Sequence, residues 1–343
     1  MTVTLKQLAA SLGLSPTTVS RALNGFPEVN PATRKRILQA AAEVEYRPNT
    51  RAKSLATGRA QAIGHVIPVS TSHEIVNPIF ADFIAGAGET YSSAGYEMIL
   101  RIVPDEEEAR AYRDLVARGS VDGVMVHAPL RHDPRVALLS ELGLPFLVHG
   151  RTSDVARPYS WLDINNQRAF RRATQFLTEF GHRRIALING LENMDFVHRR
   201  RNGYLDALRE AGLPVDEALM RNGEMTEPYG YRAVTEMVQL PDPPTAFLAS
   251  SMIVAYGLRR GLADLGLRMG RDVSIITHDD DLSYLPNQGD VPVFTTTKSS
   301  VREAGRRAAR MLLQLVEEPG TGPLTQLMES ALVVGASTGP VRK

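Results

Sequence analysis

Apolar residues recur at helical spacing in three short segments near the start of the chain. Positions three and four apart lie on one face of a helix, so each set forms an apolar stripe. The three stripes consist of Leu5, Leu8 and Leu12; of Val19, Ala22 and Leu23; and of Ile37, Leu38, Ala41 and Val44. Three helices with so few apolar residues have a very small core, which suits a domain of roughly fifty residues.

The ends of these segments match helix-capping patterns. Thr4–Gln7 has the composition of a capping box, and Ser15-Pro16 and Asn30-Pro31 each place a proline directly after a good N-cap residue. Gly13 allows a tight turn between the first two helices, and Asn24-Gly25 ends the second. Two short helices joined through a glycine are typical of a helix-turn-helix.

The second helix turns hydroxyl groups and a cation away from its apolar stripe. Thr17 and Arg21 lie four residues apart and share one face. In a helix-turn-helix, the second helix enters the major groove of DNA. The alternative is a surface helix of a larger bundle, but the caps, the turn glycine and the basic surroundings all favour the DNA-binding interpretation.

From Ala62 onward the pattern changes to strands that alternate with helices. The first series predicts strands at 63–69, 96–103, 121–127 and 145–149 and helices at 78–94, 106–118 and 134–142. The second starts near Trp161 and predicts helices at 166–180, 197–211, 229–239 and 253–265 and strands at 184–189, 245–249 and 273–278. A strand at 293–296, a helix at 300–317 and a strand at 328–334 follow. The predicted class is α/β, with two doubly wound lobes after the helical head.

Charge is unevenly distributed over the 343 residues. Residues 1–60 hold nine Lys/Arg and three Asp/Glu, whereas the remainder holds thirty and thirty-five, which indicates a polyanionic partner for the head alone. The chain has no cysteine, which excludes disulfides and thiolate metal sites. No apolar run approaches the ~20 residues of a membrane span, and residues 1–12 lack the apolar core of a signal peptide. We therefore expect no membrane partner and a cytoplasmic location.

Several motifs carry a family resemblance. The first sixty residues contain Thr4–Ala9, Ser15–Gly25 and Tyr46–Asn49. Further motifs are Asn77–Phe80, Gly181–Ala186, Asp272–Ile276 and Asp279-Asp280. In spacing and order these motifs resemble the lactose/galactose repressor family of bacterial transcriptional regulators, and the resemblance covers nearly the whole chain.

This resemblance implies a domain plan and a mode of action. The plan is a helix-turn-helix domain at 1–46, a hinge at 47–60 and an effector-binding and dimerisation core at 61–343. Within the core it implies a first lobe of about 61–160 and 291–324 and a second of about 161–290 and 325–343, whereas the pattern alone indicates only two α/β lobes. The implied function is that of a homodimeric repressor that binds a palindromic DNA operator and responds to a small, sugar-like effector.

The DNA contacts would come from the head and the connector. In the head they are Thr4, Ser15, Pro16, Thr17, Thr18, Ser20, Arg21 and Asn24. In the connector they are Asn49, Arg51, Lys53, Leu55 and Ala56. A helix over 50–56 is too short to be stable alone in water. The resemblance makes it a hinge helix that folds on DNA with Leu55 inserted into the minor groove, and the alternative is a plain linker.

Five residues stand where an effector would bind. Ligands of open α/β sheets bind at the carboxyl ends of strands, here between two lobes. The candidates near such positions are Phe80, Arg151, Arg200, Ser251 and Asp279. Arg200 and Asp279 match the family's effector-binding arginine and aspartate, and Phe80 could stack on a sugar. The alternatives are a core phenylalanine, a surface salt bridge at Arg151 and a solvated basic face at Arg200.

Two positions depart from the family pattern. Ser251-Met252 stands where relatives usually have Asn-Asp, and His278 stands where an aromatic residue is common. Because a short hydroxyl replaces an amide, the identity of the ligand does not transfer directly. Overall likeness favours an α-glucoside disaccharide as the effector.

Signals for an enzyme are weak. Gly335–Gly339 has the spacing of a nucleophile elbow, but neither a helix nor a histidine can follow it. Asp279–Asp281 could suggest a cation site, but adjacent side chains diverge in a strand. The chain also lacks a Gly-rich phosphate loop and an HExxH motif. We expect no catalytic residue, metal or cofactor; the alternative is an α/β sugar-processing enzyme with an appended DNA-binding head.

Overall fold

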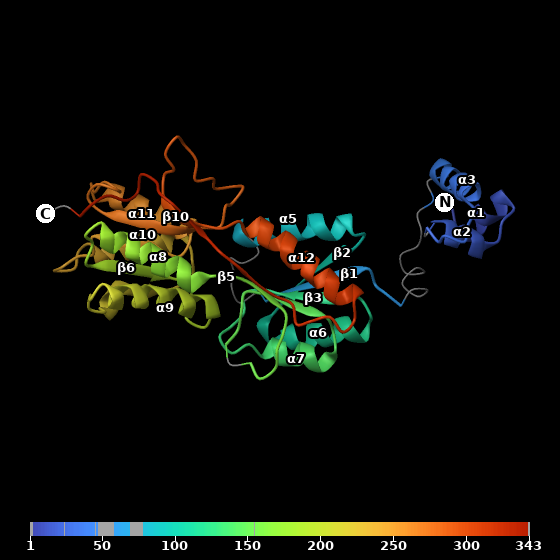
Figure 1. Cartoon of the computed structure of the whole chain (residues 1–343), viewed down its shortest axis with the longest axis horizontal. Coiled ribbons are helices and arrows are strands. Elements are labelled where there is room, and N and C mark those ends of the chain that lie inside the picture. Colours follow the sequence, from blue (N-terminus) through green and yellow to red (C-terminus); the bar gives the residue numbers. More distant parts are fainter. Residues whose placement is uncertain are drawn as a thin grey trace. The chain divides into compact units, whose positions relative to one another are not determined.

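The computed structural model describes residues 3–23, 25–44, 46, 58–68, 78–153 and 155–341. The chain forms two compact units, residues 1–60 and residues 61–343 (Figure 1). Within the described residues, none of the helices combines the length and the apolar character that a membrane crossing requires.

The described part of the first unit folds into short helices around a small core. The helices are α1 (Leu5–Leu12), α2 (Pro16–Leu23) and α3 (Pro31–Glu43). The predicted capping box is confirmed, because Gln7 N donates to Thr4 Oγ1 and Thr4 N donates to the Gln7 side chain. Gly13 ends α1 in the left-handed region with φ 66°. The core contains Leu8, Ala9, Val19, Ala22, Val29, Ile37 and Ala41.

Two residues that the pattern assigned to the core of α3 are exposed instead. Leu38 is 49% exposed and Val44 is 42% exposed. Ile37 and Ala41, four residues apart, fill the face of α3 that contacts α1 and α2. Leu38 follows Ile37 by one residue and is therefore rotated about 100° away from that face. The predicted stripe was wrong at these two positions.

The first lobe of the second unit is built on a parallel sheet. In order across the sheet, its strands are β11 (Thr325–Met328), β5 (Trp161–Ile164), β4 (Phe146–His149), β3 (Gly123–Val126), β1 (Ala62–Pro68) and β2 (Glu97–Val103). One face carries α5 (Pro78–Ser93) and α12 (Val301–Glu317); the other carries α6 (Glu108–Ala117), which follows the short helix η1 (Asp105–Glu107), and α7 (Pro134–Leu142) (Figure 1). The core lies between the sheet and the pair α5 and α12.

The second lobe has a mixed sheet with a helix pair on each face. Its strands, in order, are β12 (Ala331–Val333), β10 (Thr295–Lys298), β9 (Ser274–Asp279), β8 (Ala246–Ala249), β6 (Ile185–Asn189) and β7 (Met220–Asn222), preceded by η2 (Glu217–Leu219). The pairs are α8 (Asn166–Glu179) with α9 (Asp195–Glu210), and α10 (Glu227–Met237) with α11 (Met252–Asp264). Successive residues of a strand face opposite sides: Ile185 and Leu187 pack in one core, Ala186 and Ile188 in the other.

The strands that join the lobes are distributed differently from the expectation. Residues 161–164 and 325–328 belong to the first sheet, and residues 295–298 belong to the second. The chain therefore crosses between lobes at 165, 299–300 and 329–330, rather than near 160, 290 and 325. The pairing of β4 with β5 and of β5 with β11 is made by backbone groups, which a hydrophobic pattern does not reveal. The short strand β7 also escaped prediction.

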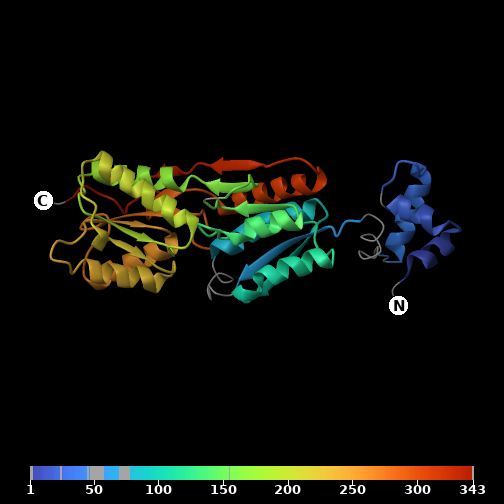
Figure 2. The ribbon, with the colours of Figure 1, turned by 90° about the horizontal axis from the view of Figure 1, so that it is seen from below.

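Glycines allow the helices of each pair to approach closely. A Cβ atom on Gly86 of α5 would lie 2.0 Å from the carbonyl oxygen of Arg302 on α12, and one on Gly305 would lie 2.2 Å from that of Phe83. Gly203 of α9 and Gly257 of α11 meet the neighbouring helix in the same way. Figure 2 shows α5 and α12 along the same lobe. Backbone-to-backbone contact of this kind leaves no space for a methyl group.

We predict that Gly86→Ala destabilises the second unit by about 1–3 kcal/mol or more, because the methyl group must push α12 away. Gly88→Ala on the same helix is the matched control: its Cβ would meet only Met98 Cε at 3.5 Å. Alanine in an open helical position is expected to gain up to about 1 kcal/mol. Urea unfolding followed by the fluorescence of Trp161, the single tryptophan, measures both. Equal stability of the two variants would contradict the close-packing account.

Candidate functional sites

The helical head presents a polar face on α2. Val19 and Ala22 are buried, whereas Pro16, Thr17 and Arg21 are exposed. Ser15 caps the helix, because its Oγ accepts a hydrogen bond of 3.0 Å from Thr18 N.

The other predicted DNA contacts in the head differ in exposure. Thr4 and Ser15 are exposed, while Thr18 and Ser20 are half-buried. Six further candidates lie outside the described residues: Asn24, Asn49, Arg51, Lys53, Leu55 and Ala56.

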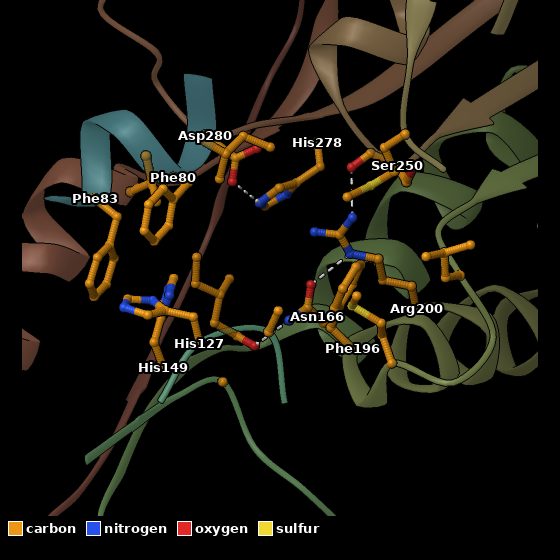
Figure 3. Close-up of a pocket in the computed structure, with 18 of the residues that line it drawn as sticks. Phe80, Phe83, His127, His149, Asn166, Phe196, Arg200, Ser250, His278 and Asp280 are labelled. Carbon is orange, nitrogen blue, oxygen red and sulfur yellow. Dashed lines mark hydrogen bonds and ion pairs between the residues drawn. The ribbon is translucent and has the colours of Figure 1, made fainter. Parts of the chain in front are cut away.

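A cavity of ≈ 340 Å³ lies between the two lobes of the second unit, and both contribute to its walls. This volume is at the lower end of the roughly 300–1,000 Å³ that is usual for small-molecule pockets. In Figure 3, Phe80, Phe83, His127 and His149 gather on one side, and Asn166, Phe196, Arg200, Ser250 and His278 lie across the cavity from them. The two walls differ in chemistry.

The first-lobe wall carries a cluster of aromatic rings. Phe83 stacks on His149 with ring centroids 4.0 Å apart. The rings of Phe80 and Phe83 each lie nearly perpendicular to that of His127, with centroids 5.1 Å apart. Burial lowers the pKa of His149 to about 4. Burial, together with the nearby imidazoles of His65 and His149 and the cation of Arg135, lowers the pKa of His127 well below its usual value. Both imidazoles are therefore neutral at pH 7, so each ring has one N–H donor and one nitrogen acceptor.

The second-lobe wall centres on Arg200 of α9. The guanidinium donates from Nε to Asn166 Oδ1 at 2.7 Å and from Nη1 to the Ser250 carbonyl oxygen at 2.6 Å. It lies over the rings of Phe170 and Phe196, 4.9 and 4.8 Å from their centroids. Burial lowers the pKa of Arg200 to about 10, so it remains a cation at neutral pH.

Further polar groups face the cavity near Arg200. Asp280 lies 3.5 Å from His278 Nε2 (Figure 3). Ser250 Oγ is buried and has no hydrogen-bond partner among the described residues. Asp163 accepts a hydrogen bond of 2.7 Å from Arg151 Nε, and burial raises its pKa. A carboxylate, a hydroxyl and a guanidinium together can donate to and accept from a ligand rich in hydroxyl groups.

Three of the five predicted effector residues line the cavity: Phe80, Arg151 and Arg200. Ser251 and Asp279 do not, and the lining residues are their neighbours Ser250 and Asp280. Ser251 Oγ caps α11 by accepting from Val254 N, and Asp279 Oδ1 accepts from Asp281 N. Side chains alternate along an extended chain, so adjacent residues point to opposite sides. A role of Ser251 and Asp279 in effector binding stays a prediction.

Other polar lining residues belong to no sequence motif, and only their position relative to the strands could have indicated them. His127, His149, Asp163 and Asn166 stand at or just after strand ends, which is the one rule that could have found them.

The weak enzyme and metal signals have structural explanations. Ser337 is fully buried: its Oγ accepts from Thr295 N and donates to the Ile275 carbonyl oxygen, so the hydroxyl joins backbone segments. In the part of the chain that the structure describes, no three His, Asp or Glu side chains are placed to hold a metal ion.

The pH dependence of stability is expected to reflect His65, which is fully buried next to His127. Burial lowers its pKa to about 3, whereas an unfolded histidine titrates near 6.5. Below pH 6.5 the unfolded chain therefore binds a proton that the folded chain does not bind until about pH 3. The free energy of unfolding should fall by about 1.4 kcal/mol per pH unit from this group.

We predict that His65→Phe reduces that slope between pH 6 and pH 4.5 by about 1.4 kcal/mol per unit. Urea unfolding of both proteins at several pH values, followed by Trp161 fluorescence, measures it. The slope is the readout, so a uniform loss of stability in the variant does not affect it. Equal slopes would show that His65 is not neutral in the folded protein.

Comparison with known proteins assigns both units of the chain to one family. The family model "Bacterial regulatory proteins, lacI family" matches residues 4–49, and "Periplasmic binding proteins and sugar binding domain of LacI family" matches residues 60–330. The HTH-type transcriptional regulator AglR of Rhizobium meliloti is 45% identical over 342 residues, which cover 99% of this chain and 95% of AglR.

Solved structures are similar over the same length. A complex of the transcriptional regulator CelR with cellobiose has a TM-score of 0.72 at 31% identity and covers 98% of this chain and 99% of that one. The lac repressor dimer bound to operator and the anti-inducer ONPF has a TM-score of 0.83 at 25% identity, with coverage of 99% and 100%. The chain belongs to the LacI family and is a transcriptional regulator with a helix-turn-helix DNA-binding head and a sugar-binding domain.

Proposed function

We propose that this regulator is a repressor, that it binds a palindromic operator as a homodimer, and that a disaccharide glycoside releases it. The observation that carries the proposal is the cavity between the lobes, with an aromatic wall facing a wall of hydrogen-bonding groups. The similar lac repressor structure is a dimer bound to operator, which supports the assembly and the sign of regulation.

The chemistry of the two walls supports a sugar effector. The flat rings of Phe80 and His149 suit the C–H face of a pyranose. Across the cavity, Asp280 accepts hydrogen bonds, Arg200 donates them, and the unpaired Ser250 hydroxyl does both. An alkane would leave the polar groups around Arg200 without hydrogen-bond partners, and a strongly charged ligand would place charge against the aromatic rings.

We propose an α-glucoside disaccharide as the specific effector. The cavity of ≈ 340 Å³ is small for a pocket and suits two sugar rings better than a longer oligosaccharide. The similar regulator CelR forms a complex with cellobiose, a β-linked glucose disaccharide, which supports a glucose disaccharide as the ligand class. The α configuration is proposed from the overall likeness of the sequence alone. We propose binding without turnover, since the serine with nucleophile-elbow spacing is committed to backbone hydrogen bonds.

A homodimer would cover an apolar sheet edge. Strand β2 lies at the edge of the first-lobe sheet, and its Leu100 and Ile102 are 45% and 48% exposed. An exposed edge strand with apolar side chains is prone to association, and native proteins usually cover it. A second copy with its own helical head would then read the second half of a palindrome.

In the DNA complex, α2 would lie in the major groove with Thr17 and Arg21 toward the bases. The proposed hinge helix would place Leu55 in the minor groove, with Arg51 and Lys53 on phosphates. Effector binding would shift the balance between two lobe arrangements, of which only one spaces both heads correctly.

We predict that Arg21→Ala relaxes base preference, because arginine pairs bidentately with guanine at about 1–3 kcal/mol of discrimination. Arg51→Ala is the control: it should weaken all sequences alike and reduce the salt slope by about 1. Fluorescence anisotropy on an operator obtained by in vitro selection, and on its single-base variants, measures both. If Arg21→Ala weakens every sequence equally, Arg21 contacts the backbone.

We predict that Arg200→Lys weakens effector binding about tenfold to a hundredfold, because lysine cannot keep both hydrogen bonds and point at the ligand. Operator binding without effector should remain. Arg201 is a half-buried neighbour on the same helix that pairs with Glu217, so Arg201→Lys is the matched control and should bind like the parent. Thermal shift with maltose, trehalose, sucrose and cellobiose selects the sugar, and calorimetry gives its affinity. Unchanged affinity in Arg200→Lys would remove Arg200 from the site.

A further inference from the structure

The two lobes meet directly at one flank of the cavity, in a contact that we call the clasp. It consists of Pro129–Arg131 and Ser153 of the first lobe and Asn193–Asp195 of the second. Asp195 N donates to the Pro129 carbonyl oxygen at 3.2 Å, and Arg131 N donates to that of Asn193 at 2.9 Å. These bonds flank an antiparallel bridge between Leu130 and Met194. Ser153 Oγ donates to Asp195 Oδ1 at 2.5 Å.

Buried side chains of the first lobe hydrogen-bond to the backbone of the first-lobe half of the clasp. Asp133 Oδ2 accepts from Leu130 N at 3.0 Å, and the Thr152 hydroxyl donates to the Arg131 carbonyl oxygen at 3.0 Å. Arg135 binds Asp133 at 2.6 Å and also donates to the carbonyl oxygen of Ala128, whose φ is 44°. Because Asp133, Arg135 and Thr152 are all buried, these hydrogen bonds hold the clasp backbone of the first lobe in place.

The second-lobe half depends on one buried carboxylate. Asp195 is 1% exposed and stands at the start of α9, where the helix dipole favours a negative charge. Arg199 of the same helix pairs with it. Its charge is therefore balanced within the second lobe, and Ser153 contributes the side-chain hydrogen bond that comes from the other lobe.

The clasp is continuous with the cavity wall. Pro129 and Met194, which belong to it, line the cavity from the two lobes, whereas Ser153 and Asp195 do not. Asp195 also begins the helix that carries Arg200, five residues later. A change in the clasp would thus move one wall relative to the other without altering any group that touches a ligand.

We propose that Ser153 and Asp195 are positioning residues for the effector, which hold the two walls of the cavity at binding distance through Pro129 and Met194. This inference rests on the proposed function, in which the effector binds between the lobes. If the binding-competent arrangement is populated only in part, the apparent dissociation constant rises in inverse proportion to that fraction. Loss of the Ser153 hydroxyl leaves the buried Asp195 oxygen without its donor from the first lobe and lowers the fraction.

The test compares Ser153→Ala with Ser153→Thr, which restores the hydroxyl, in the full chain. Ser140→Ala is the matched control, because Ser140 Oγ bonds only within α7, to the Val136 carbonyl oxygen. Calorimetry uses maltose, trehalose, sucrose and cellobiose as probes. We expect Ser153→Ala to bind the preferred sugar about tenfold more weakly than the parent, and the other two variants to bind within about twofold.

Hydrogen–deuterium exchange of the sugar-free protein tests the clasp independently of any ligand. In Ser153→Ala, amides of residues 130–133 and 193–197 should exchange faster, with the rest of the second unit unchanged and Ser153→Thr like the parent. Unchanged exchange in Ser153→Ala would overturn the structural role of the clasp, whether or not a probe sugar binds. If no probe sugar binds the parent, that result counts against the proposed function and leaves the exchange test of the clasp intact. Parent-like sugar affinity in Ser153→Ala would overturn the positioning role.

Discussion

The buried guanidinium of Arg200 requires hydrogen-bond acceptors and negative charge, and residues from both lobes of the second unit supply them. A cation removed from water costs several kcal/mol unless its N–H groups are paired and opposite charge lies nearby. Asn166 at the start of α8 and the Ser250 carbonyl oxygen after β8 supply the pairing. Asp280 after β9 and Asp163 at β5 supply the charge that favours the cation. Since β5 belongs to the first-lobe sheet, part of this compensation reaches Arg200 across the cavity.

That arrangement gives the cavity its polarity. Charged and amide groups are concentrated around Arg200, while burial keeps the facing His127 and His149 neutral. His149 stacks on Phe83, and His127 meets phenylalanine rings at nearly right angles. The chain passes between the lobes three times, at 165, 299–300 and 329–330, and the clasp adds direct contacts at one flank. A ligand that satisfies both walls therefore acts on the same separation of lobes that the crossovers and the clasp control.

Local rules were sufficient for the elements but not for their partners. The capping box at Thr4 and the alternation of apolar strands and helices predicted nearly every element, because these signals are read within a few residues. Which sheet a strand joins depends on long-range backbone pairing. The expected lobe was therefore wrong for residues 161–164, 295–298 and 325–328. The same limit applies to Ser251 and Asp279: each is adjacent to a residue that lines the cavity, but the strand pattern does not say which of the two neighbours faces it. The prediction that Leu38 is buried was wrong for a similar reason: its neighbour Ile37, one position away on the helix, faces the core instead.

The central claim is that a disaccharide bound between the lobes controls the DNA-binding head. The most direct measurement is a titration of the preformed complex of the unmodified full chain and its selected operator with maltose, trehalose, sucrose and cellobiose, followed by anisotropy of labelled DNA. The account predicts that an α-glucoside releases the operator at concentrations that also raise the melting temperature of the free protein. A sugar that raises the melting temperature but leaves the complex intact would contradict the account.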